Sequence, residues 1–345
     1  MKLLAILLCL LILALPASAL EVEAPTVPEM GKQWMPHNTQ SLAEGLLELV
    51  QKGILSLRPD LKEASRVSLG ILAAVLMICT VQSVSAAVKT TAELAGTVAV
   101  AAMLLLSTKS MIRLAADTIL EIGAYGKLLL PVMTTALAAQ GGISGSAALY
   151  AGTALFSSIL QSAMNHVLIP GIYLYLALGT GSSATGESLL KKMAQTLKGF
   201  LGWLLKGILG VFTTYLALTG VVSGTTDAAA LKAAKVTMST VIPVVGSVLS
   251  DASEAVLVSA GLMKNAAGIY GILATLALFL HPFLKIGVQY LILRVTAAIC
   301  SVFGSSSVTE LVEAFSDGLG LLLGMTASAC VMVFISTVCF MKGVS

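Results

Sequence analysis

Residues 236–282 read VTMSTVIPVVGSVLSDASEAVLVSAGLMKNAAGIYGILATLALFLHP. The stretch is apolar enough for a bilayer, but Pro243 removes a backbone donor and disfavours helix at the residue before it. Unpaired backbone groups and charges in hydrocarbon cost on the order of several kcal/mol each. The stretch therefore predicts a broken membrane helix that is shielded by protein or lines a wet cavity. The residues that define this candidate site are Pro243, Gly246, Ser247, Asp251, Glu254, Lys264 and Asn265.

The two acidic residues of this stretch have two interpretations. Asp251 as an N-cap and Glu254 three residues later would form an acidic capping box. Alternatively, Ser247, Asp251 and Glu254 form one polar stripe at spacings of four and three, facing a cavity, because acids at membrane depth are functional candidates. The two roles are compatible at different ends of one helix.

Composition places the whole chain in a membrane. Its 345 residues are 57% hydrophobic and only 11% charged, whereas soluble domains carry about 25% charged residues. The net charge of +3 is too small to indicate nucleic-acid binding. The cysteines and histidines have no metal-binding spacing, and no nucleotide-binding or hydrolase motif occurs. We therefore predict an all-α, polytopic helical membrane protein that is not an enzyme and holds no cofactor.

The N-terminus is typical of a secretory signal peptide over residues 1–19. Lys2 precedes a short apolar core, and Ala17-Ser18-Ala19 forms a cleavage site, so the mature chain is expected to begin at Leu20. An uncleaved anchor is the alternative. Residues 20–66 then form an extracytoplasmic segment with an amphipathic helix, which starts at Ser41 and Glu44 as a capping box and ends at residues 58–60. This helix lies on the membrane or the bundle, or it docks a partner.

Residues 67–345 form the polytopic domain, with about seven transmembrane helices. The lysine-rich residues 179–198 are predicted to be cytoplasmic and the acidic residues 304–317 to lie outside. This topology places the N-terminus outside the cytoplasm and the C-terminus inside. Residues 107–127 and 227–240 are predicted as amphipathic helices, the first at the membrane interface. The predicted spans are residues 67–88, 91–106, 147–178, 199–223, 268–280, 283–300 and 319–341.

A second broken region covers residues 128–178. Pro131 lies in a short apolar segment, Gly141-Gly142 forms a flexible break, and Asn165-His166 interrupts the helix that follows. The pattern predicts a re-entrant half-helix followed by one long kinked span. Two interrupted segments in corresponding positions are typical of transporters with inverted repeats. Broken helices packed without any pore are the alternative. For Asn165 and His166, an interhelical hydrogen bond or a position at the membrane interface is the alternative to a transport role.

Three segments of this chain resemble one known family. The segments AAKVTMSTVIPVVGSVLSDASEAVLVSAGLMKNAAGIYG, LPVMTTALAAQGGISGSAALY at residues 130–150 and NHVLIPGIYLYLAL at residues 165–178 are similar to the stage III sporulation protein AE family of spore-forming Firmicutes. The signal peptide and the multi-span body match the layout of that family as well. The extracytoplasmic segment of this chain is reduced by comparison.

The resemblance implies a multi-pass protein of the mother-cell membrane around the forespore. It implies a channel-like or export-gate-like subunit of a transenvelope complex, with the other stage III AA to AH proteins as partners, including an ATPase and ring-forming components. It supplies no catalytic residue. An independent secondary transporter for a small solute is the alternative. A transporter would bind its solute alone, whereas a subunit of a complex would co-purify with partners.

Overall fold

The chain folds into a set of long helices. The computed structural model describes residues 25–37, 41–84, 89–139, 143–241, 246–303 and 306–342, with side chains placed except at 83–84, 89–90, 143–145, 217, 219–241, 246–264 and 342. Every regular element in these ranges is helical, which confirms the predicted all-α class. The elements are α2 (Glu29–Lys32), α3 (Leu42–Val84), α4 (Lys89–Ala139), α5 (Ile143–Ala163), the π-helix η3 (Met164–Leu168), α6 (Ile169–Thr185), α7 (Ser188–Val241), α8 (Gly246–Val302) and α9 (Ser306–Lys342).

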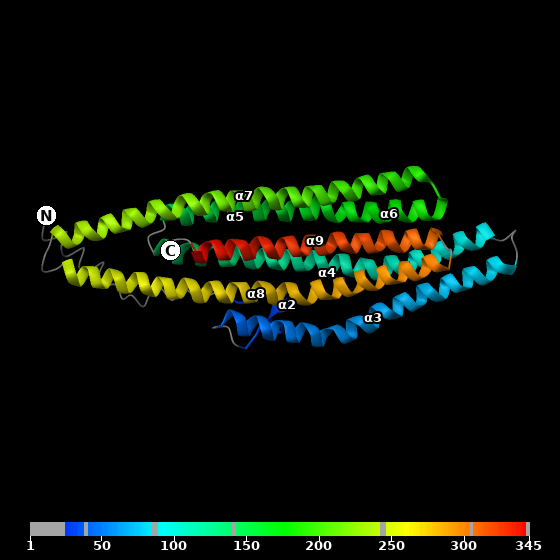
Figure 1. The fold of residues 1–345 in the computed structure, drawn as a ribbon, viewed down its shortest axis with the longest axis horizontal. Coiled ribbons are helices and arrows are strands. Elements are labelled where there is room, and N and C mark those ends of the chain that lie inside the picture. Colours follow the sequence, from blue (N-terminus) through cyan, green and yellow to red (C-terminus); the bar gives the residue numbers. More distant parts are fainter. Residues whose placement is uncertain are drawn as a thin grey trace.

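The long helices run side by side along one axis (Figure 1). Helices α4 and α9 lie between α5, α6 and α7 on one side and α3 and α8 on the other. Helix α9 packs against α4, α5, α6, α7 and α8, so it occupies the middle of the bundle. Many of its inward side chains are apolar and fully covered, among them Phe315, Leu319, Leu322 and Met325.

Six segments are long and apolar enough to cross a membrane, by length and composition, within the described ranges. The predicted polytopic membrane class is therefore confirmed, while the count of about seven is not. The difference arises at Pro282, where two predicted spans form the single helix α8. The segments are residues 42–82, 91–139, 146–185, 188–216, 265–302 and 306–341.

These helices are much longer than a bilayer requires. Helix α8 has 57 residues, which corresponds to roughly 85 Å at 1.5 Å per residue. A hydrocarbon core is only about 30 Å thick. The end of α7 and the start of α8 also extend past the other helices at one end of the bundle (Figure 1). A substantial part of the bundle would therefore project beyond an upright bilayer.

Two local predictions are confirmed. The backbone N–H of Glu44 donates to Ser41 Oγ at 3.5 Å, and α3 begins at the next residue after Ser41. The predicted interruption at Asn165 is the π-helix η3, which joins α5 to α6 in one long pass. Pro170 follows at the start of α6, and a wider turn relieves the strain that a proline imposes on the preceding helical turn.

Three predictions for segments that contain or flank a proline are wrong. Pro59 does not end a helix, because α3 continues through it to Val84. Pro131 does not belong to a re-entrant half-helix, because α4 continues through it to Ala139. Pro282 lies inside α8. In a membrane bundle, neighbouring helices and local adjustments accommodate the backbone groups that a proline frees, so a proline does not have to end the helix.

The prediction of an interfacial helix over residues 107–127 is also wrong. This segment belongs to α4, and its apolar face is buried in the core through Met111, Ile112, Ile119 and Ile122. Its polar face carries an ion pair, since Arg113 Nε lies 3.8 Å from Asp117 Oδ2. Amphipathicity arises here from one core-facing stripe and one exposed stripe on a long helix.

Candidate functional site

A network of charged side chains ties four helices together near the turn between α6 and α7. Asp317 of α9 is its centre and is only 19% exposed. Lys198 Nζ of α7 donates to Asp317 Oδ2 at 2.6 Å, and Arg294 of α8 donates to Oδ1. The hydroxyl of Tyr175 on α6 donates to Oδ2 at 3.5 Å. One carboxylate therefore contacts a side chain from each of three neighbouring helices.

A second ion pair lies beside this network. Lys191 Nζ donates to Glu310 Oε1 at 2.9 Å, which joins α7 to α9. The two pairs border a pocket of about 160 Å³ whose wall also includes Ser182, Ser183 and Glu313. The turn that positions this wall contains Gly186 at φ +72°, a left-handed conformation that favours glycine. We call this site the charged-end pocket.

These ion pairs overturn part of the predicted topology. Residues 179–198 and 304–317 were expected on opposite sides of the membrane, yet Lys191 and Glu310 are in contact. The six candidate spans of the described residues also bring the start of α3 and the end of α9 to the same half of the bundle (Figure 1). Lys191 and Lys198 each pair with a carboxylate of α9, so these lysines and acids mark one end of the bundle.

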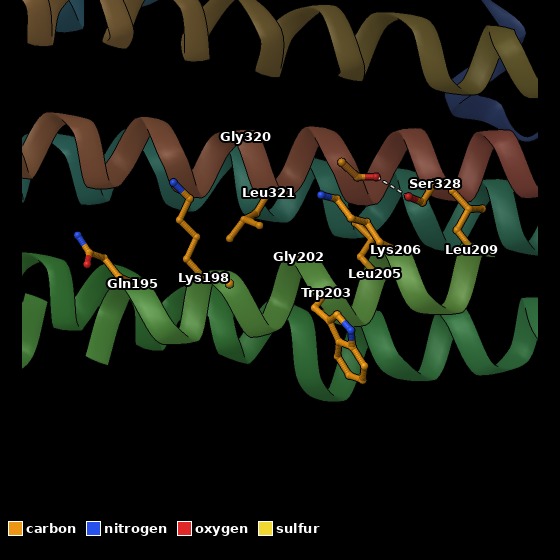
Figure 2. A pocket seen from close by; sticks show the side chains of 12 residues that line it. Gln195, Lys198, Gly202, Trp203, Leu205, Lys206, Leu209, Gly320, Leu321 and Ser328 are labelled. Atoms are coloured by element: carbon orange, nitrogen blue, oxygen red, sulfur yellow. Dashed lines mark hydrogen bonds between the residues drawn. The ribbon is translucent and has the colours of Figure 1, made fainter. Parts of the chain in front are cut away.

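An open groove of about 800 Å³ continues from the charged-end pocket between α7 and α9. Gln195 and Lys198 line both cavities. Figure 2 shows Lys198 and Lys206 reaching from α7 toward α9, while Trp203 points away from α9. The remaining lining residues are small or apolar, and they are Gly199, Gly202, Leu205, Leu209, Gly320, Leu321, Gly324 and Ser328. We call this cavity the α7–α9 groove.

A separate buried cluster joins α3 to α8. Asp60 is 7% exposed, and Lys285 Nζ lies 3.6 Å from its Oδ1 and donates to Glu63 Oε2 at 2.9 Å. His281 Nδ1 lies 4.0 Å from Asp60 Oδ2, which is too long for a hydrogen bond. The ring of Trp34 stacks on His281 with centroids 4.6 Å apart. The charge of Asp60 is thus compensated across the helix pair by Lys285.

The structure describes the predicted site residues only in part. Helix α7 ends at Val241 and α8 begins at Gly246, so Asp251 lies inside α8 and is not an N-cap. Pro243, Gly141 and Gly142 lie outside the described residues. Asn265 is exposed, and Asn165 is half-buried in η3. The cavity role of the remaining residues stays a prediction, because their side chains are not described; these are Ser247, Asp251, Glu254 and Lys264.

The two charged clusters were missed by the sequence interpretation. Arg294 interrupts an apolar run, which is the signal that would have identified it, whereas Asp60 lies in a polar stretch that gives no such signal. Their partners lie on other helices, and no spacing along the chain reveals that pairing. Within the part of the chain that the structure describes, no group of three or more histidine, cysteine or acidic residues is placed to hold a metal ion. The described cavities and charged clusters provide ion pairs and apolar contacts.

Such a bundle, with a charged pocket and a lateral groove, is that of a polytopic helical membrane protein. The sequence profile described as stage III sporulation protein AE matches residues 27–343. The chain therefore belongs to the stage III sporulation protein AE family.

One curated relative is the stage III sporulation protein AE of Bacillus subtilis (strain 168), which is 24% identical over 225 residues. The alignment covers 65% of this chain and 56% of the relative. The chain thus aligns with little more than half of that protein. No solved structure matches this chain.

Proposed function

We propose that this protein is a channel-like or export-gate-like membrane subunit of the complex that joins the mother cell and the forespore. Its partners would be the other stage III AA to AH proteins, including an ATPase and ring-forming components. Its place would be the mother-cell membrane around the forespore. The observation that carries the proposal is the family match over residues 27–343, together with six apolar helices suited to a membrane.

The packing of the bundle favours a subunit over an independent solute transporter. The interior cavity between α4, α5 and α9 measures about 10 Å³, although hydroxyls of Thr153, Ser157 and Ser336 line it. That volume suits about one water molecule, whereas small-molecule sites measure about 300–1,000 Å³. The larger space is the α7–α9 groove, which opens on the side of the bundle where another protein can reach it.

Deleting the gene in the source organism tests the proposal. Deletion should reduce heat-resistant spores and the expression of a late forespore reporter, and the wild-type gene should restore both. The tagged protein should co-purify with other stage III proteins from sporulating cells. Normal sporulation after deletion, or solute uptake by the purified protein alone in liposomes, would favour the transporter instead.

The N-terminal processing is a separate proposal. Cleavage after Ala19 would leave Leu20 as the first residue and place the start of α3 outside the cytoplasm. Six crossings would then place the end of α9 on the same side, which replaces the earlier expectation of a cytoplasmic C-terminus. Sequencing the N-terminus of the membrane-inserted protein tests the cleavage, and Met1 as the first residue would contradict it.

We also propose that the residues around the α7–α8 connection are required for sporulation. Pro243→Leu and Gly246→Leu should leave insertion intact and reduce sporulation. Because Asp251 lies inside α8, Asp251→Asn tests a charge-dependent role without a capping effect. The measurement is sporulation efficiency at equal membrane abundance. Normal sporulation in all three variants would mean that this stretch is ordinary packing.

A further inference from the structure

The α7–α9 groove carries positive charge that its own wall does not balance. Lys198 and Lys206 line it, and its lining residues include no carboxylate. Lys198 is paired with Asp317 at the polar end of the groove. Among the described side chains, none pairs with Lys206, whose exposed ammonium group reaches toward α9 (Figure 2).

Lys206 also lies well away from the polar end of the bundle. It is eight residues beyond Lys198 on the same helix, or roughly 12 Å along the axis. Glycine and apolar residues surround it in sequence, from Gly199 to Leu205 and from Gly207 to Phe212. Charged groups within membrane segments are rare and are usually paired or placed in a wet cavity.

We propose that the α7–α9 groove binds a transmembrane helix of another membrane protein, and that this helix presents an aspartate or glutamate to Lys206. The groove extends on α7 from Gln195 to Leu209, roughly 21 Å, or about four helical turns. Glycines at positions 199 and 202 leave open space, because a methyl group added at either would meet no atom within 4 Å. Small residues of this kind allow a second helix to approach closely.

Two other occupants fit the charge less well. A lipid headgroup lies at the membrane surface, and the charged network around Asp317 marks the polar end about 12 Å away from Lys206. A second copy of this chain in a two-fold contact would bring its own Lys206 toward the first, because such a contact uses the same surface twice. A helix with a carboxylate at that depth satisfies both the shape and the charge.

Photocrosslinking in sporulating cells tests this inference. The photoreactive amino acid p-benzoylphenylalanine replaces Trp203, which is 69% exposed and therefore tolerates the change. The expected product is a crosslink to an apolar segment of about 20 residues in another protein, with an acidic residue in that segment. Lys206→Glu should lower the crosslink yield about 3- to 20-fold, the range of polar contacts between membrane helices. Exchanging the partner's acid for lysine should restore it.

The chain offers matched controls for both charge and bulk. Lys192→Glu makes the same charge change on α7, at an exposed position that does not line the groove, and should leave the yield unchanged. Gly202→Leu should lower the yield, whereas Gly207→Leu, which also meets open space but does not line the groove, should not. Crosslinks to lipid alone, to a second copy or to residues 1–24 of the same chain would overturn the proposal. Equal yields in Lys206→Glu and Lys192→Glu would overturn it as well.

This inference names the kind of partner that the proposed subunit binds. It rests on the proposed function in one respect, the choice of sporulating cells as the place where that partner is made. The two fail separately. A mapped helix crosslink with normal sporulation after gene deletion would refute the proposed function and leave the groove assignment standing. Loss of sporulation after deletion, with no helix crosslinked from position 203, would support the proposed function and refute the groove assignment.

Discussion

Replacing Asp317 with alanine should loosen the polar end of the bundle. The carboxylate contacts Lys198, Arg294 and Tyr175, and removing it leaves two cations without their shared partner. Exposed ion pairs contribute about 0.2–1 kcal/mol each, and breaking a buried pair costs about 3–5 kcal/mol. Asp317 is 19% exposed, and its two cationic partners are 40% and 42% exposed. We therefore expect a loss of about 2–3 kcal/mol.

Labelling of the buried Cys330 thiol measures this loss. Cys330 lies on α9 with 4% exposure, so a thiol reagent reaches it only when the helix opens. In a background where the other cysteines are alanine, Asp317→Ala should raise the labelling rate about 30- to 150-fold. Glu313→Ala is the matched control, an exposed acid of the same pocket with no ion pair in the described residues. Equal rates in the two variants would refute the reasoning, as would a difference that high salt does not reduce.

Three further outcomes follow from the packing and from the path of the chain. Gly152→Ala places a methyl group 1.8 Å from the ring of Tyr215, whose hydroxyl donates to a backbone carbonyl of α5. The substitution should destabilise the bundle by about 2–4 kcal/mol, measured by the same thiol assay. Tyr125→Phe removes a buried hydroxyl that has no hydrogen-bond partner among the described residues and should slow labelling or leave it unchanged; faster labelling would show that the hydroxyl is satisfied. Reporter fusions after Ser183 and Ser306 should report the same side of the membrane, and opposite sides would contradict the six-pass fold.

Much of the architecture is predictable from hydropathy, because a long apolar helix has a clear sequence signal. The all-α membrane class, the start of α3 and the interruption at Asn165 are all confirmed. Helix ends are less predictable where proline is concerned. Pro59 and Pro282 would end most helices in water, yet each lies inside a long helix, Pro59 at an exposed position and Pro282 at a buried one.

The candidate site was less predictable for a different reason. Charge counting assigned Lys191 and Glu310 to opposite sides, because the positive-inside rule treats each loop separately. The pair at 2.9 Å shows that the two segments share one end. Likewise, Asp60 and Lys285 are 225 positions apart in the chain, and only the packing of α3 on α8 brings them together.

The length of the helices has a mechanical consequence. A stiff rod amplifies a small rotation about one point into a large displacement at its far tip. For a helix such as α8, at roughly 85 Å, a tilt of about 5° moves the tip by roughly 7 Å. The end of α7 and the start of α8 lie at such a tip (Figure 1). A small rotation of the bundle within the membrane would therefore displace the helix tips well outside the bilayer.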